Sequence, residues 1–167
     1  LYRLVGSEMC IRDRSDFLSL FGNVFEKTES VAVEAFESKP FKNFEDIMFK
    51  MLDIYENYEK NKILEILNAH PELAVAKKMT SESISEQASA KLNQCSNDEY
   101  EEFKKLNSEY KKKFNFPFII AVKGKDKNEI LNNFRQRIQS DVESEFLEAK
   151  KQVKKIATFR LNEINKK

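Results

Sequence analysis

Apolar residues recur every three or four positions along most of this chain, and polar residues fill the positions between them. This spacing places the apolar side chains on one side of a helix. Candidate N-caps stand before several of these stretches, with Ser15 or Asp16 before the first, Asn43 before the third and Asp126 before the seventh. The predicted helices cover residues 15–25, 30–37, 43–55, 60–69, 83–93, 98–114, 126–138 and 141–165.

One segment departs from the helical spacing. Residues 116–122 are apolar, partly β-branched and interrupted by Pro117, which favours an extended, buried segment. Elsewhere the chain has only three Gly and three Pro, too few for the many turns of a sheet-rich fold. The sequence therefore predicts an all-α fold: a single-domain bundle of about seven or eight helices with one short extended segment near 116–122.

The first fourteen residues, Leu1 to Arg14, differ from the rest. The segment does not start with Met and lacks the apolar stretch of a signal peptide. Its string of residues 4–13 resembles translated sequencing-adaptor read-through. We expect residues 1–14 to be a non-native, disordered leader, with the native start missing, and residues 15–167 to form the helical domain.

Charge excludes some classes of partner. The 29 basic and 28 acidic residues nearly cancel and are interleaved, whereas a nucleic-acid binder carries a stripe of basic residues. The short basic run Lys111 to Lys113 is typical of the solvated C-terminal end of a helix. No apolar run approaches the ~18 residues of a membrane span. We therefore expect no nucleic-acid partner and no membrane insertion.

Cysteine and histidine are too few for most metal sites. Cys10 and Cys95 make no disulfide framework, so a reducing compartment such as the cytoplasm is expected. The single histidine and two distant cysteines cannot form a zinc site of the usual type. The chain also lacks a calcium-binding loop and a Gly-rich phosphate loop. We therefore expect no metal site.

Polar side chains on apolar helix faces are candidates for chemistry. At ~100° per residue, Arg160 lies within the stripe formed by Val153, Ile156 and Ala157. A guanidinium there must reach solvent, form an internal ion pair or bind an anionic ligand. The first two roles are structural, and the third is functional.

His70 has a similar position at the end of the fourth predicted helix. Viewed down the helix axis, it lies on the apolar face between the directions of Ile66 and Leu67, and Pro71 then ends the helix. The helix dipole stabilises an imidazolium at this end, while burial opposes it. Histidine exchanges protons near neutral pH, so His70 is either a structural cap or a general acid/base.

The pattern Ser83-x-x-Glu86 predicts a capping box, in which both side chains bind amides at a helix start. The same helix start could aim amide N–H groups and a carboxylate at a ligand. The box alone does not separate these two roles.

In series, these motifs resemble the 2-oxo-4-hydroxy-4-carboxy-5-ureidoimidazoline (OHCU) decarboxylase family. Their order and spacing agree from about Phe17 to Asn162. The matching strings are Phe21-Gly22-Asn23, Pro40-Phe41, His70-Pro71-Glu72-Leu73-Ala74, Thr80-Ser81-Glu82-Ser83 with Glu86-Gln87, Leu106-Asn107 with Tyr110, Phe114-Asn115-Phe116-Pro117-Phe118, and Lys155-Ile156 with Arg160-Leu161.

The resemblance implies an all-helical, often homodimeric carboxy-lyase that acts without a cofactor on a small ureidoimidazoline in urate breakdown, giving (S)-allantoin and carbon dioxide. His70 would be the general acid/base, with Glu86 beside it in catalysis. Glu86 and Gln87 would hold substrate N–H groups, and Arg160 would neutralise the substrate carboxylate or a ring carbonyl. The implied substrate-binding residues are Pro71, Ser83, Gln87, Phe118, Ile119, Ile120, Ala121, Val122 and Arg160.

The chain departs from the family pattern at three positions that commonly hold Gly, namely Val75, Lys91 and Asn115. These changes favour an alternative, a catalytically inactive helical module that binds a ligand. A further alternative is an unrelated structural bundle in which every motif serves capping or packing. The C-terminal Asn165-Lys166-Lys167 also lacks the peroxisomal Ser-Lys-Leu signal of some relatives.

Overall fold

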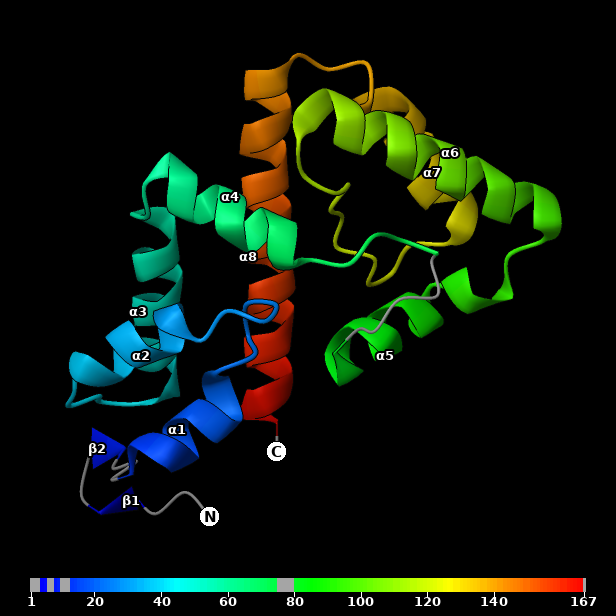
Figure 1. Ribbon diagram of the computed structural model, residues 1–167. Helices are drawn as coiled ribbons and strands as arrows, with labels where there is room; N and C mark the ends of the chain where they lie inside the picture. Colours follow the sequence, from blue (N-terminus) through cyan, green and yellow to red (C-terminus); the bar gives the residue numbers. More distant parts are fainter. Residues whose placement is uncertain (1–3, 6–7, 10–12, 75–79, 167) are drawn as a thin grey trace. The chain divides into compact units, whose positions relative to one another are not determined.

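The computed structural model describes residues 4–5, 8–9, 13–74 and 80–166 (Figure 1). Within these ranges the chain forms eight α-helices, one 3-10 helix and two two-residue strands, which confirms the prediction of an all-α fold. The elements are β1 (Leu4–Val5), β2 (Glu8–Met9), α1 (Arg14–Phe21), α2 (Ser30–Glu37), α3 (Phe44–Glu56), α4 (Lys60–Ala69), α5 (Ser81–Ser89), η1 (Leu92–Gln94), α6 (Asn97–Phe114), α7 (Lys127–Arg137) and α8 (Val142–Asn165).

The chain divides into two compact units. The first unit comprises Leu1–Ile66 with Lys154–Lys167, and the second comprises Leu67–Val153. Within the predicted leader, β1 and β2 pair antiparallel, while residues 1–3, 6–7 and 10–12 lie outside the described ranges. The assignment of residues 1–14 to a non-native leader stays a prediction.

Two predicted helix starts are wrong by one or two residues. The helix α1 is capped by Asp13, whose Oδ1 accepts from the Ser15 N–H at 2.9 Å, so neither Ser15 nor Asp16 is the cap. The helix α5 is capped by Thr80, whose Oγ1 accepts from the Ser83 N–H at 3.3 Å. Ser83 therefore lies inside the first turn, and Ser83-x-x-Glu86 is not a capping box. Thr80 and Ser83 are both good caps, and the earlier one is used.

The other caps agree with the sequence. Asn43 accepts from the Asp46 N–H at 2.8 Å and starts α3. Asp126 and Glu129 form a full capping box at the start of α7. The basic residues 111–113 occupy the last turn of α6, as predicted. These signals are short-range, so the local sequence is sufficient to predict them.

The core of the first unit is aromatic. Phe17 packs against Phe21 and Phe36 with ring centroids 4.6 and 5.4 Å apart, and Phe25 stacks on Tyr55 at 4.8 Å. All five side chains are buried. The apolar face predicted for the first helix therefore packs inside this unit, where large rings contribute most of the buried area.

The core of the second unit surrounds Tyr110. Its ring makes edge contacts with Phe118 and Phe134, whose own rings stack with centroids 3.9 Å apart. Phe116 and the residues from Phe118 to Val122 are each at most 6% exposed, and they lie in neither a helix nor a strand. The predicted buried, non-helical segment is confirmed.

Two of the three positions where the family commonly has Gly adopt the left-handed backbone conformation. Lys91 has φ 57° and Asn115 has φ 64°, the latter as the C-cap of α6. Asn tolerates this conformation better than Lys, because its short polar side chain forms local hydrogen bonds. Lys91 also explains why α5 ends at Ser89, short of the predicted Asn93. The third position, Val75, lies outside the described residues.

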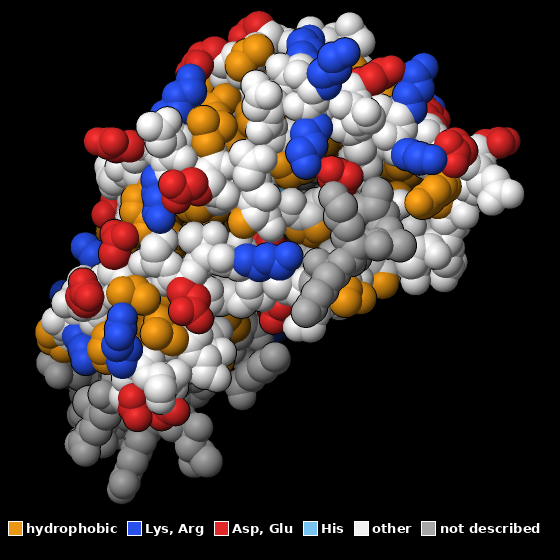
Figure 2. Space-filling view, viewed as in Figure 1, with side chains coloured by type: hydrophobic (Ala, Val, Ile, Leu, Met, Phe, Trp, Pro, Cys, Tyr) orange, Lys and Arg blue, Asp and Glu red, His pale blue; other side chains and the backbone are white. Residues whose placement is uncertain are grey.

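Charged side chains of both signs cover the surface. On the face shown in Figure 2, Lys and Arg side chains are interspersed with Asp and Glu. Among the described helices, none combines the length and apolar character that crossing a membrane requires.

Candidate active site

His70 lies directly after the last turn of α4, at the start of the second unit. Its backbone N–H donates to the Leu67 carbonyl at 3.2 Å, and Pro71 follows without an N–H to continue the helix. The imidazole is 8% exposed and its Nε2 atom is buried. The sequence therefore places the single histidine at a helix end inside the protein, as predicted.

The segment that follows His70 and Pro71 is held through three successive residues. Gln87 Nε2 donates to the Glu72 carbonyl at 3.3 Å, and its Oε1 accepts from the Ala74 N–H at 3.1 Å. Between them, Asn107 Nδ2 donates to the Leu73 carbonyl at 2.9 Å. Ala74 has φ 53°, a left-handed conformation that needs such support. Segment 72–74, and with it the adjacent His70, is thus fixed by two amide side chains.

Asn107 holds this segment although its role was not predicted from the sequence. It is 3% exposed on a face of α6 that also carries Phe103, Leu106 and Tyr110. An amide on such an apolar face is the same signal that singled out Arg160 and His70. Its hydrogen bond satisfies a buried carbonyl, which is costly to leave unpaired.

The predicted residues of α5 share one helix face. Ser83, Glu86 and Gln87 are spaced i, i+3 and i+4, so their side chains are neighbours. Ser83 and Gln87 are buried, and Glu86 is partly exposed. Since Gln87 contacts residues 72 and 74, this face of α5 is the one that faces the segment behind His70.

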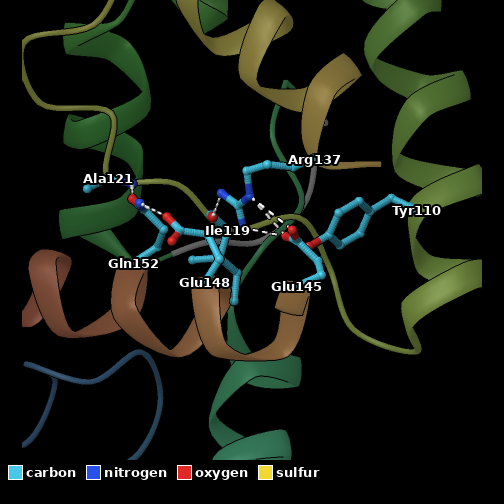
Figure 3. Close-up of polar contacts among 7 residues, drawn as sticks. All are labelled: Tyr110, Ile119, Ala121, Arg137, Glu145, Glu148 and Gln152. Atoms are coloured by element: carbon cyan, nitrogen blue, oxygen red, sulfur yellow. Dashed lines mark hydrogen bonds and ion pairs between the residues drawn. The ribbon is translucent and has the colours of Figure 1, made fainter. Parts of the chain in front are cut away.

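The extended segment 118–122 is held by two side chains (Figure 3). Arg137 Nη1 donates to the Ile119 carbonyl at 2.8 Å, and Gln152 Oε1 accepts from the Ala121 N–H at 2.9 Å. Gln152 Nε2 in turn donates to Glu148 Oε1 at 2.6 Å. We call residues 118–122 the wall, and these two side chains anchor it from α7 and α8.

Arg137 is itself held by a buried carboxylate. Its Nε donates to Glu145 Oε1 at 3.0 Å, its Nη2 contacts the same oxygen, and the Tyr110 hydroxyl donates there too (Figure 3). Burial raises the pKa of Tyr110, and the hydrogen bond to Glu145 raises it further. The guanidinium also lies 4.5 Å from the centroid of the Phe118 ring. The wall is thus tied to α6, α7 and α8 together.

Helix α6 connects the two halves of the candidate site. Asn107 and Tyr110 are three residues apart and so lie on the same face. Asn107 binds Leu73, while the Tyr110 ring packs 5.3 Å from Phe118. In the second unit, the His70 segment, the α5 face and the wall are therefore organised around one helix.

Arg160 belongs to the first unit. Its Nη2 donates to Glu26 Oε2 at 3.1 Å and its Nη1 to the Asn23 carbonyl at 3.2 Å. Of the three roles considered for a guanidinium on this stripe, an internal ion pair is present. Its partner Glu26 is fully buried and was not predicted from the sequence. The substrate-binding role of Arg160 stays a prediction.

The described residues bring no three His, Cys, Asp or Glu side chains together in the way a metal ion would need. The polar side chains of the α5 face and of Asn107 are two amides, a hydroxyl and one carboxylate, and the two amides bind segment 72–74. Such groups hold and orient a polar organic molecule through hydrogen bonds. The second unit therefore carries a candidate acid/base group beside hydrogen-bonding side chains.

Known proteins are similar to this chain over most of its length. The uric acid degradation bifunctional protein of Bacillus sp. (strain TB-90) is 41% identical over 90% of this chain, which spans 30% of that protein's length. The 2-oxo-4-hydroxy-4-carboxy-5-ureidoimidazoline decarboxylase of Haloferax volcanii is 36% identical, over 90% of both chains.

Solved structures share the fold. A crystal structure of (S)-allantoin synthase matches with a TM-score of 0.70 and 28% identity, over 92% of this chain and 51% of that one. A crystal structure of OHCU decarboxylase in the presence of (S)-allantoin matches with a TM-score of 0.73 and 24% identity, over 91% and 98%. The family model described as OHCU decarboxylase covers residues 12–162. The chain therefore belongs to the OHCU decarboxylase family.

Proposed function

We propose that this chain is a carboxy-lyase that converts OHCU to (S)-allantoin and carbon dioxide in urate breakdown. The match of the family model to residues 12–162, with His70 buried at the end of α4, is the observation that carries the proposal. The decarboxylase of Haloferax volcanii has nearly the same length as this chain, which supports an activity contained in this one domain.

The chemistry requires little more than orientation and proton handling. The carbon that bears the carboxylate adjoins a ring C=N bond in the substrate. When the bond to the carboxylate breaks, its electron pair forms a C=C bond to the neighbouring ring carbon, the C=N pair moves onto the ring nitrogen, and carbon dioxide leaves. The hydroxyl then gives up its proton to become the ring carbonyl, while the ring nitrogen and one face of the former C=N carbon each gain a proton. Decarboxylases whose substrates lack such an electron sink use a cofactor to provide one.

His70 is the general acid/base in this proposal. It exchanges a proton with the substrate hydroxyl or with the enolate-like centre that develops as carbon dioxide leaves. Histidine is suited to this role because an unperturbed imidazole exchanges protons near neutral pH. General acid/base catalysis of this kind contributes typically about 10²–10⁴-fold.

The α5 face binds the polar groups of the substrate. Glu86 accepts from ureido or ring N–H groups, with Ser83 one turn away and Pro71 beside His70. Gln87 keeps a role at the substrate even though it binds segment 72–74, because an amide offers two N–H donors and two lone pairs. It can therefore serve the segment and a ligand together.

The wall 118–122 and Arg160 complete the proposed binding groups. Backbone groups of the wall orient the substrate, and its apolar side chains exclude water, which favours loss of a charged carboxylate as neutral carbon dioxide. Arg160 binds the substrate carboxylate or a ring carbonyl. We further propose that the enzyme works as a homodimer, as the resemblance implies, and in the cytoplasm, a reducing compartment that suits its cysteine content.

Circular dichroism of product formed in situ tests the proposal. The labile substrate is made from urate with urate oxidase and hydroxyisourate hydrolase, and the protein is then added. Spontaneous decay gives racemic allantoin, so growth of the (S)-allantoin signal reports catalysis. We expect rapid growth with the wild-type protein and a loss of about 10²-fold or more with His70→Asn. Unchanged turnover in a folded His70→Asn variant would contradict the role of His70. No acceleration by the wild-type protein would favour the inactive binding module.

A further inference from the structure

We infer that Gln152 is a positioning residue that holds the wall 118–122 in the position needed to orient the substrate. Glu148 in turn fixes the orientation of the Gln152 side-chain amide. This inference rests on the proposed function. Gln152 touches the backbone of the wall, and its effect on the reaction passes through that backbone. Neither Gln152 nor Glu148 belongs to the motifs that carry the family resemblance.

The orientation of the Gln152 amide is imposed by its two partners. Its Nε2 donates to Glu148 Oε1 at 2.6 Å, and only the nitrogen can donate to a carboxylate. The amide oxygen must then face the opposite way, where it accepts from the Ala121 N–H at 2.9 Å. Gln152 is 7% exposed, so water does not readily replace either partner. Glu148 therefore determines which end of the amide meets the wall.

Two contacts hold the wall from one side. Arg137 binds the Ile119 carbonyl and Gln152 binds the Ala121 N–H (Figure 3). In an extended segment, backbone groups two residues apart point the same way and those of the residue between point the opposite way. We infer that the N–H and carbonyl of Ile120 are directed away from these two side chains. Ile120 is therefore the backbone unit that the wall offers to a substrate.

Of the two anchors, Gln152 is the one that can be altered without breaking the core. Arg137 belongs to the buried cluster with Glu145 and Tyr110, and its loss would leave a buried carboxylate unpaired. Gln152 contributes one bond to the wall and one to Glu148. Its replacement leaves the cluster intact while freeing the Ala121 end of the wall.

An exchange of the two side chains provides the test. In Gln152→Glu, two carboxylates would face each other where an amide and a carboxylate now stand 2.6 Å apart, and their repulsion displaces the wall. We expect kcat/KM to fall by about 10- to 100-fold, because a displacement of ~1 Å can cost that much. The enantiomeric excess of allantoin should fall as well, since the wall holds one face of the substrate.

The double variant Glu148→Gln/Gln152→Glu restores one amide and one carboxylate in reversed order. The introduced carboxylate can accept both from the Ala121 N–H and from the introduced amide, so the bond to the wall is kept. We expect kcat/KM to return to within about threefold of wild type, together with the enantiomeric excess. Glu148→Gln alone completes the double-mutant cycle. Gln152→Met removes the acceptor without adding charge and should show the same loss as Gln152→Glu.

Gln136→Glu, the same chemical change on the exposed side of α7, is the matched control. The wild-type protein is assayed first, since its inactivity would refute the proposed function and not the role of Gln152. If the wild-type protein is active, a Gln152→Met variant that keeps the wild-type turnover and enantiomeric excess would overturn the inference. A folded double variant that recovers neither quantity would overturn it too.

Discussion

Replacing Glu145 by Gln removes a charge on which three elements of the second unit converge. The carboxylate is 1% exposed and accepts from Arg137 and from the Tyr110 hydroxyl. Its partner Arg137 has a side chain that is 11% exposed. After the substitution, the guanidinium keeps its bond to Ile119 but loses its counter-charge in a nearly water-free place.

The size of the effect follows from this burial. Removing one partner of a buried ion pair typically costs about 3–5 kcal/mol of unfolding free energy. The new amide oxygen still accepts a hydrogen bond and Arg137 retains slight access to water, so we expect the lower end, about 3 kcal/mol. In a chain of this length each kcal/mol shifts Tm by about 2–4 °C, which gives a fall of about 6–12 °C.

Urea unfolding followed by far-ultraviolet circular dichroism, with scanning calorimetry for Tm, measures this loss. Tyr110→Phe removes one hydrogen bond to the same carboxylate and should cost less, about 1.5 kcal/mol. Glu101→Gln is the control, because its ion pair with Lys104 is 3.7 Å long and both side chains are more than half exposed. That change should cost less than about 1 kcal/mol. A Glu145→Gln protein within about 1 kcal/mol of wild type would show that the buried charge of Glu145 contributes little to stability.

Three further changes probe other parts of the structure. Asn107→Ala should lower stability by about 2–3 kcal/mol and reduce kcat, because it leaves the buried Leu73 carbonyl unpaired next to the His70 segment. Urea unfolding measures the stability and steady-state kinetics measure kcat, and native values of both would contradict the role of Asn107. Lys91→Gly should raise the free energy of unfolding by about 0.5–1 kcal/mol, because Gly removes the steric cost of φ 57°; a lower Tm would count against this. Burial and the hydrogen bond to Glu34 raise the pKa of Tyr58 to about 12, above the value of about 10 for an unfolded tyrosine. The contribution of Tyr58 to stability is therefore present below pH ~10 and is lost as pH rises toward ~12. Tyr58→Phe should flatten that loss in urea unfolding between about pH 9 and 11.5, and an unchanged slope would exclude this origin.

Helix positions could be predicted from the sequence because their signals are local. Asn43 and Asp126 each cap a helix within three residues of themselves, so spacing alone identifies them. The start of α5 was missed for the same reason, since Thr80 and Ser83 are both adequate caps and local spacing does not choose between them.

The groups that hold the candidate site could not be predicted so directly. Gln152 binds Ala121 across 31 residues of chain, and Asn107 binds Leu73 across 34. Periodicity indicates that a residue is buried and does not identify its partner. A polar residue on an apolar helix face was nevertheless a usable signal. It singled out Arg160, and applied to every helix it would also have found Asn107 and Gln152.

In the proposed reaction this chain breaks the bond between the substrate carbon and its carboxylate. Substrate made from urate that carries ¹³C at the carbon destined to become the carboxylate allows this bond to be followed by NMR. We expect that adding the protein speeds the loss of the carboxylate signal and the matching growth of labelled bicarbonate well beyond the spontaneous rate. Equal rates with and without folded protein would show that the chain does not catalyse this reaction.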